Sequence, residues 1–239
     1  MLFSRDDVAA FVNRYFEPVW ESVRPVPIVR IDFGNGNVLT RTLHGNIATY
    51  VCSADGQVLD LLAGIYTPAV YLTRLQQFRL LANYVDQQGA GKRAERLRDY
   101  HKGQLTAMAK NEQPAVLVNL PDMGKARIER PLKAILVVGD RARAVAETDA
   151  ARAKLGGDPK LDSAEDLATW KALAQDTEAN ESVRRKQVHE LLASTNSPTP
   201  AALTKRIYKD ILHADLDDPY LGLGSSLFAS YPFKDDKPH

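Results

Sequence analysis

The sequence predicts a mixed α/β fold: a mixed β-sheet flanked by helices, followed by a mostly α-helical C-terminal region. Residues 47–52 are rich in β-branched and apolar side chains, and an Ala-Asp-Gly turn at 54–56 separates them from a second apolar run at 57–62. Thr67-Pro68 then combines an N-cap with proline in the first turn, which indicates a helix. Beyond residue 160 the apolar residues recur at helical spacing.

The elements before this hairpin are predicted to be a helix, a strand and a tight turn. Ser4 is expected to be the N-cap of the helix, which Pro18 should end because proline lacks a backbone donor. Residues 28–33 read as a strand, and the Gly-Asn-Gly-Asn stretch at 34–37 is a strong turn signal. Residues 38–43 fit a strand and a short helix equally well.

The helix that begins at Pro68 is expected to reach about Val85. Residues 92–100 are highly charged and predict a solvent-exposed helix. Two short apolar runs, at 115–120 and 134–138, are typical of strands covered on both faces.

A Gly-Gly-Asp-Pro turn at 156–159 ends an alanine-rich charged stretch and marks the expected domain boundary. We therefore predict an α/β domain over residues 1–145 and a helical region over residues 160–239. Three separate helices are expected in the helical region. The predicted starts are a Ser163 cap, residue 180 and Thr199-Pro200.

Composition excludes several function classes. The formal net charge of +1 over 239 residues argues against nucleic-acid binding by bulk electrostatics. A single cysteine, Cys52, excludes an intrachain disulfide and any CxxC pair. The longest apolar run, residues 134–139, is too short to span a bilayer, and the acidic N-terminus is unlike a secretion signal. A cytoplasmic location away from membranes is expected.

Residues 46–75 resemble the second half of a thioredoxin-like domain. Ile47-Ala48-Thr49 stands where that family carries Ile-cisPro-Thr, and the spacing onward to Gly56, Gly64 and Thr67-Pro68 is similar. Residues 28–32 resemble the strand that precedes this segment in the family. The resemblance implies a thioredoxin-like fold over about the first third of the chain.

The chain departs from that family at its chemistry. The strand–helix unit that carries the CxxC motif is missing, and Ala48 replaces the cis-proline. A cis bond before a residue other than proline costs about 3 kcal/mol, so a trans bond is expected at Ala48. Dithiol exchange within one chain is excluded, because there is only one thiol.

Cys52 is the candidate catalytic residue. Beside a cationic group such as Arg41 or His44 it would form a thiolate and act as a monothiol redox enzyme or sensor. The competing interpretation is an inert, buried core residue, which is the commoner state of a free cysteine.

The candidate binding residues lie at the position where the family binds its partners and just before the helix cap. They are His44, Asn46, Ala48 and Tyr66. Tyr66 is the one expected to contribute to an exposed recognition surface.

No metal site and no cofactor are predicted. The C-terminal region offers imidazoles and carboxylates that suit zinc or iron, but at spacings that match no compact motif. These residues are His189, Glu190, His213, Asp215, Asp217 and Asp218.

The sequence thus favours a non-catalytic thioredoxin-like module for binding or assembly. Its partner is expected to be a protein, with a homo-oligomer as one form. The monothiol enzyme or sensor at Cys52 is the alternative, and a metal-dependent hydrolase built on His189 and His213 is the weaker one.

Overall fold

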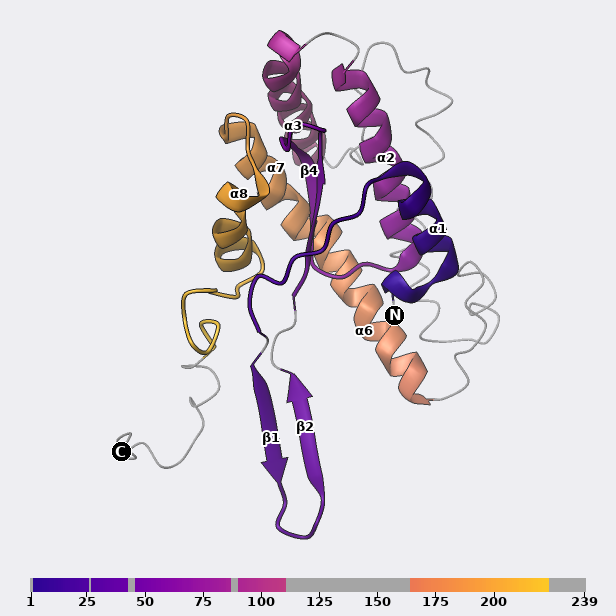
Figure 1. Ribbon diagram of the computed structural model, residues 1–239, viewed down its shortest axis with the longest axis vertical. Helices are drawn as coiled ribbons and strands as arrows, with labels where there is room; N and C mark the ends of the chain where they lie inside the picture. The colour runs from indigo at the N-terminus through magenta and orange to yellow at the C-terminus, as the bar shows by residue number, and fades with distance from the viewer. Residues whose placement is uncertain (1, 26, 43–45, 87–89, 111–163, 224–239) are drawn as a thin grey trace.

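The computed structural model describes residues 2–25, 27–42, 46–86, 90–110 and 164–223. These residues form a mixed α/β structure, which confirms the predicted class (Figure 1). The predicted strands at 115–120 and 134–138, and the boundary between 145 and 160, lie outside the described residues. No helix in the described part of the chain is long and apolar enough to cross a membrane.

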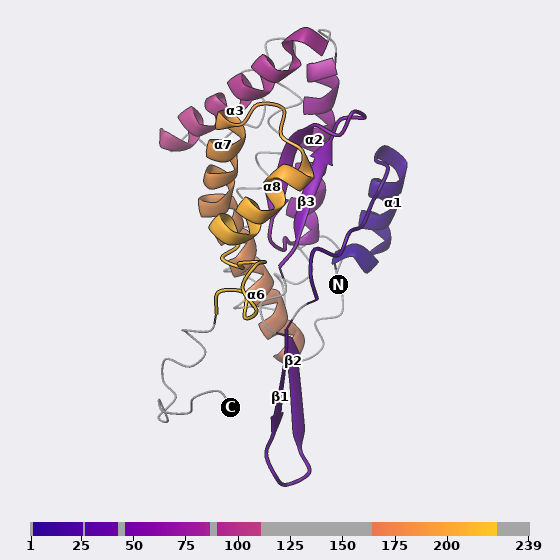
Figure 2. The same ribbon diagram turned by 60° about the vertical axis from the view of Figure 1, so that its left-hand side comes forward.

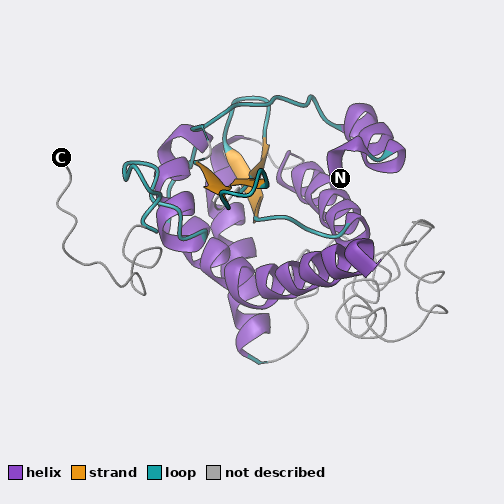
Figure 3. Ribbon diagram, turned by 90° about the horizontal axis from the view of Figure 1, so that it is seen from below, coloured by secondary structure: helices purple, strands orange, loops and turns teal. Residues whose placement is uncertain are grey.

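The centre of the fold is the predicted hairpin, in which β3 (Ala48–Cys52) pairs antiparallel with β4 (Val58–Ala63). Gly56 closes the turn at a φ of 82°, which glycine adopts without a steric penalty. All six residues of β4 are buried. Seen from below, helices lie on either side of the strands and a loop crosses above them (Figure 3).

Helix α2 (Pro68–Asp86) covers one side of the hairpin and agrees with the predicted helix. Helix α1 (Asp6–Tyr15) packs on it, and the two share an apolar cluster with Leu62 of β4. The prediction that Ser4 is the N-cap of α1 was wrong. Ser4 ends a short 3₁₀ turn, η1 (Leu2–Ser4), and Arg5 occupies the N-cap position.

After the 3₁₀ turn η2 (Ala90–Lys92), helix α3 (Arg93–Ala109) lies along α7 (Arg185–Ser194) and also contacts α2, with which it shares an apolar cluster around Leu59 of β4. The prediction of a solvent-exposed helix was wrong for one face of α3. The residues buried on that face recur every three or four positions. They are Leu97, Tyr100, His101 and Gln104.

The helix predicted to start at residue 180 is not separate from the one before it. Helix α6 (Ala164–Ala179), the π-helical turn η4 (Asn180–Arg184) and α7 follow one another without a break. Asn180 is fully buried, and its Nδ2 donates to the carbonyl of Ile65 at 2.7 Å. A Cβ at Gly64 would lie 2.8 Å from the Asn180 side chain, so this close approach requires glycine.

The last helix begins as predicted. Thr199 Oγ1 accepts a hydrogen bond from Ala202 N at 3.3 Å and caps α8 (Pro200–Arg206), and a π-helical turn, η5 (Ile207–Ile211), follows. The apolar face of this segment packs on β4 and α7 in one core. The buried members of this core include Val58, Leu61, Val188, Leu192, Leu203, Ile207 and Leu212.

The strands β1 (Ile28–Asp32) and β2 (Val38–Thr42) form a separate hairpin, which we call the arm. Its turn is held by Asp32 Oδ1, which accepts from Gly34 N at 2.9 Å, and by Asn35 Oδ1, which accepts from Asn37 N at 3.0 Å. Among the described residues the arm pairs with no other strand, so the expected mixed sheet is not found there. The arm projects from the helical body (Figures 1 and 2).

Candidate functional site: a buried polar network and an exposed arm

A carboxylate, Asp60, lies at the centre of the buried strand β4, and Arg185 of α7 pairs with it. Arg185 Nη1 donates to Asp60 Oδ1 at 2.8 Å and Arg185 Nη2 donates to Oδ2 at 2.9 Å. The Leu61 amide and the Tyr100 hydroxyl donate to the same carboxylate at 2.7 and 3.1 Å. These hydrogen bonds compensate for the removal of both charges from water.

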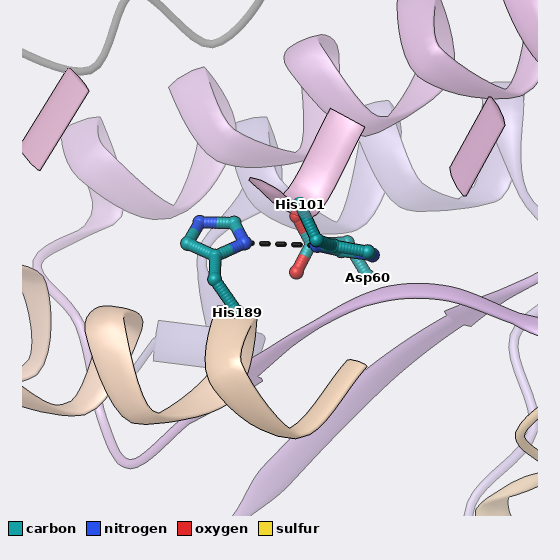
Figure 4. A group of neighbouring side chains, drawn as sticks. All are labelled: Asp60, His101 and His189. Atoms are coloured by element: carbon teal, nitrogen blue, oxygen red, sulfur yellow. Dashed lines mark hydrogen bonds between the residues drawn. The ribbon is translucent and has the colours of Figure 1, made fainter. Parts of the chain in front are cut away.

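Two histidines continue the network from Arg185. Arg185 Nη2 lies 3.0 Å from His189 Nε2, the two Nδ1 atoms of His189 and His101 lie 2.9 Å apart, and His101 Nε2 lies 3.1 Å from the carbonyl of Leu59. Figure 4 shows the two rings meeting beside Asp60.

The partners fix both tautomers. A carbonyl only accepts, so His101 carries its proton on Nε2, and a guanidinium only donates, so His189 carries its proton on Nδ1. His189 Nδ1 therefore donates to His101 Nδ1, and every ring nitrogen has a partner. The hydrogen bonds run in one direction, from Arg185 through both imidazoles to the backbone of β4.

Burial and charge keep the histidines neutral. Burial lowers the pKa of His101 to about 4. Burial and the adjacent Arg185 charge hold the pKa of His189 well below its ordinary value. Burial alone would raise the pKa of Asp60, but the charge and hydrogen bonds of Arg185 outweigh it and lower that pKa. Near neutral pH the network is thus one ion pair joined to two neutral rings.

Asp60, His101 and His189 each offer a ligand atom within 4.8 Å of the others, a donor set that suits zinc or iron. The remaining contacts do not suit a cation. Both Asp60 oxygens accept from Arg185, whose guanidinium also contacts His189. A zinc ion about 2.1 Å from each Nδ1 would displace the proton that joins the rings and would lie beside this positive charge. The geometry therefore favours a structural network over a metal centre.

The histidine pair proposed from the sequence does not come together in this network. His213 is exposed, with a φ of 54°. The nearby acidic residues form surface ion pairs instead, Asp215 with Lys209 and Asp217 with Lys205. The sequence also missed His101 as the partner of His189.

A second polar bridge joins α2 to η4. Arg74 is 2% exposed and forms a bidentate ion pair with Glu181, and its Nη1 donates to Gln77 Oε1 at 3.0 Å. Beside this bridge, the amide of Thr67 donates to Thr177 Oγ1 at 2.8 Å. Polar contacts therefore connect the continuous helix formed by α6, η4 and α7 to both β4 and α2.

Cys52 lies at the end of β3 and is exposed, so the expectation of a buried core cysteine was wrong. Partial burial of its thiol raises its pKa above the ordinary value. A raised pKa leaves less thiolate at neutral pH, which argues against an activated monothiol nucleophile. The side chains of Arg41 and His44, the expected cationic neighbours, lie outside the described part.

The remaining predicted binding residues that are described contribute to packing. Asn46 Nδ2 donates to the carbonyl of Leu212 at 3.1 Å, and Ala48 is half-buried against the core shared by β4 and α7. Tyr66 is fully buried, so it does not contribute to an exposed surface. Its hydroxyl has no hydrogen-bond partner among the described residues.

The arm carries large apolar side chains in contact with water. The exposed fractions are 66% for Ile28, 42% for Ile31, 60% for Phe33 and 44% for Val38. An isolated two-stranded hairpin is only marginally stable in water, and its edges are ready to pair with another strand. Apolar residues gathered at such a place indicate an interaction surface.

The base of the arm is fastened to the body by Arg24. Its guanidinium donates to the backbone carbonyls of Leu216, Asp218 and Pro219, with distances of 3.2 Å to Leu216 and 2.9 Å to Pro219. These contacts hold the chain that enters β1 against the turn that follows η5.

Comparison with protein-family models, curated proteins and solved structures found no match to this chain.

Proposed function

We propose that this protein is a non-catalytic binding or assembly module that engages a protein partner through the arm. The main support is that the arm combines exposed apolar side chains with two edges that are unpaired among the described residues. The partner presents an extended segment with apolar side chains. Such a segment adds a strand to the arm through main-chain hydrogen bonds and covers Ile31 and Phe33.

The rest of the described molecule supports binding over catalysis. The polar cluster richest in chemistry, around Asp60, is at most 1% exposed at both histidines and at the carboxylate. A substrate has no access to groups so deeply buried. Cys52 is accessible, but its raised pKa makes it a poor nucleophile.

We also propose that β3, β4 and α2 are a degenerate thioredoxin-like half. Its support is the order of a buried hairpin, a glycine at Gly64 and a closing helix, together with the sequence resemblance. In this proposal β1 has left the family's sheet to form the arm with β2, and the protein works in the cytoplasm.

Site-specific photocrosslinking tests the binding role. A benzophenone amino acid replaces Phe33, which is 60% exposed on the arm, or Val183, which is 56% exposed on η4 and serves as the matched control. After irradiation of cells that naturally contain the protein, we expect a discrete protein adduct from position 33 and none from position 183. Equal labelling at the two positions, or no adduct at either, would contradict the proposed function.

A further inference from the structure

We infer that the partner strand is β1 of a second copy of this chain, so that two arms join into one four-stranded antiparallel sheet, two strands from each. The inference rests on the proposed function, which it deepens by naming the partner. It follows from which backbone groups of β1 point away from β2 and from the charges beside them.

No strand among the described residues pairs with the outer edge of β1, and the register with β2 decides which backbone groups lie on that edge. Phe33 N donates to Asn37 O at 3.1 Å, which continues the β1–β2 register beyond Asp32↔Val38. In an antiparallel pair, residues whose backbone bonds face the partner alternate with residues whose bonds face away. Because Phe33 faces β2, the amides and carbonyls of Ile28, Arg30 and Asp32 face away from it.

Two copies related by a twofold axis can pair these outward groups in five registers, one centred on each residue from Ile28 to Asp32. The registers centred on Ile28 and Val29 place Arg30 opposite no charged residue of β1. A register centred on Arg30 places the two Arg30 residues opposite each other, and one centred on Asp32 does the same with the two carboxylates. A register centred on Ile31 places Arg30 opposite Asp32 of the second copy, twice. Like charges directly opposite destabilise a sheet and opposite charges stabilise it, so charge selects the register centred on Ile31.

The side chains available on the arm suit this register. Arg30 and Asp32 are both exposed, and among the described residues Arg30 has no acidic partner. Ile31 meets Ile31 of the second copy at the axis, and Phe33 lies on the same face two residues along, because side chains alternate along a strand. Both are exposed in one chain, and pairing removes part of this apolar area from water.

The outer edge of β2 has no charged residues that would favour one pairing register over another. By the same alternation, the outward backbone groups of β2 belong to Val38, Thr40 and Thr42, none of which is charged. The edge of β1 is therefore the one whose sequence is complementary to itself.

Charge-swap variants test the pairing by sedimentation equilibrium between about 1 and 500 µM, a range chosen because so short a strand pair makes a small, weak interface. The wild type is expected to dimerise with increasing concentration. Arg30→Asp alone and Asp32→Arg alone replace both attractive pairs by repulsive ones and should weaken dimerisation about tenfold or more.

An equimolar mixture of the two variants restores both opposite-charge pairs, so the mixture should recover dimerisation as a heterodimer. The control is Lys186→Asp, a charge change on an α7 side chain that is 61% exposed, which should leave dimerisation unchanged. Rescue in the mixture distinguishes specific pairing from any general damage that a single variant causes.

A wild type that stays monomeric at every concentration, or a mixture no better than its components, would overturn the self-pairing. If the probe at Phe33 then captures a different protein, the proposed binding function stands without the second copy. If the probe at Phe33 captures no protein, the proposed binding function and the self-pairing of β1 are both contradicted.

Discussion

The buried carboxylate of Asp60 requires a cationic partner within the core of this protein. One carboxylate in an otherwise apolar buried strand requires a cation, and Arg185 supplies it with two hydrogen bonds. Leaving either charge unpaired would cost about 3–5 kcal/mol, so the pair fixes the position of α7 over β4.

Two buried tyrosines next to this network provide a matched test. Tyr100→Phe removes a donor to the Asp60 carboxylate and should lower the free energy of unfolding by about 1.5–3 kcal/mol. Tyr66→Phe removes a hydroxyl without a partner among the described residues, so stability should stay constant or rise by about 1 kcal/mol. Urea denaturation measures both. Equal losses in the two variants would contradict the assignment of hydrogen bonds.

Some residues of this buried network could be predicted from the sequence. Asp60 stands out within Val58–Ala63, and Arg185 and His189 share a helix face with Val188 because they are four residues apart. The burial of His101 could not be predicted, because the charged residues around it indicated an exposed helix. Its burial depends on α7, which lies far along the chain.

Elements with local signals were predicted well. The turn at 54–56 and the Thr199 cap rest on residues that act on their immediate neighbours. The break expected at residue 180 was wrong, because Asn180 bonds to Ile65 from within a continuous helical run. The helix is continuous there, and the buried side chain of Asn180 contacts a segment more than 100 residues away, which no local pattern reveals.

At the scale of elements, the histidine pair joins β4, α3 and α7, and its protonation should control their packing. Both histidines have a lowered pKa in the folded protein, so the unfolded chain binds protons first as the pH falls. Their stabilising contribution is complete above the ordinary histidine pKa of about 6.5 and is lost as the pH falls below it, in the case of His101 down to its folded-state pKa of about 4. The titration of His101 alone should lower the free energy of unfolding by about 2 kcal/mol between pH 7.5 and 5, and the titration of His189 acts in the same direction.

Urea denaturation at those two pH values measures this loss. His101→Gln should reduce the pH dependence more than the same change at the exposed His213. A free energy of unfolding that is independent of pH over this range would contradict the neutral, buried pair.

At the scale of the whole molecule, a helical body encloses one hairpin and leaves the other projecting (Figure 2). The strand and turn of the arm could be predicted from residues 28–37, but its separation from β3 and β4 could not. Whether a hairpin joins a sheet depends on which edges are free, and that is a property of the assembled fold. The thioredoxin-like resemblance pointed to one sheet, whereas β1 pairs with β2.

Amide hydrogen exchange at single-residue resolution reports whether the edge of β1 is a binding edge. In dilute protein, the amides of Arg30 and Asp32 should exchange fast, while the amide of Phe33, bonded to Asn37, is protected. At high concentration Arg30 and Asp32 should become protected as arms pair. Protection of both amides at every concentration would mean that another part of the same chain covers the edge of β1. Fast exchange of both amides at every concentration would mean that β1 does not pair with β1 of a second copy. Either result would contradict the pairing of two arms.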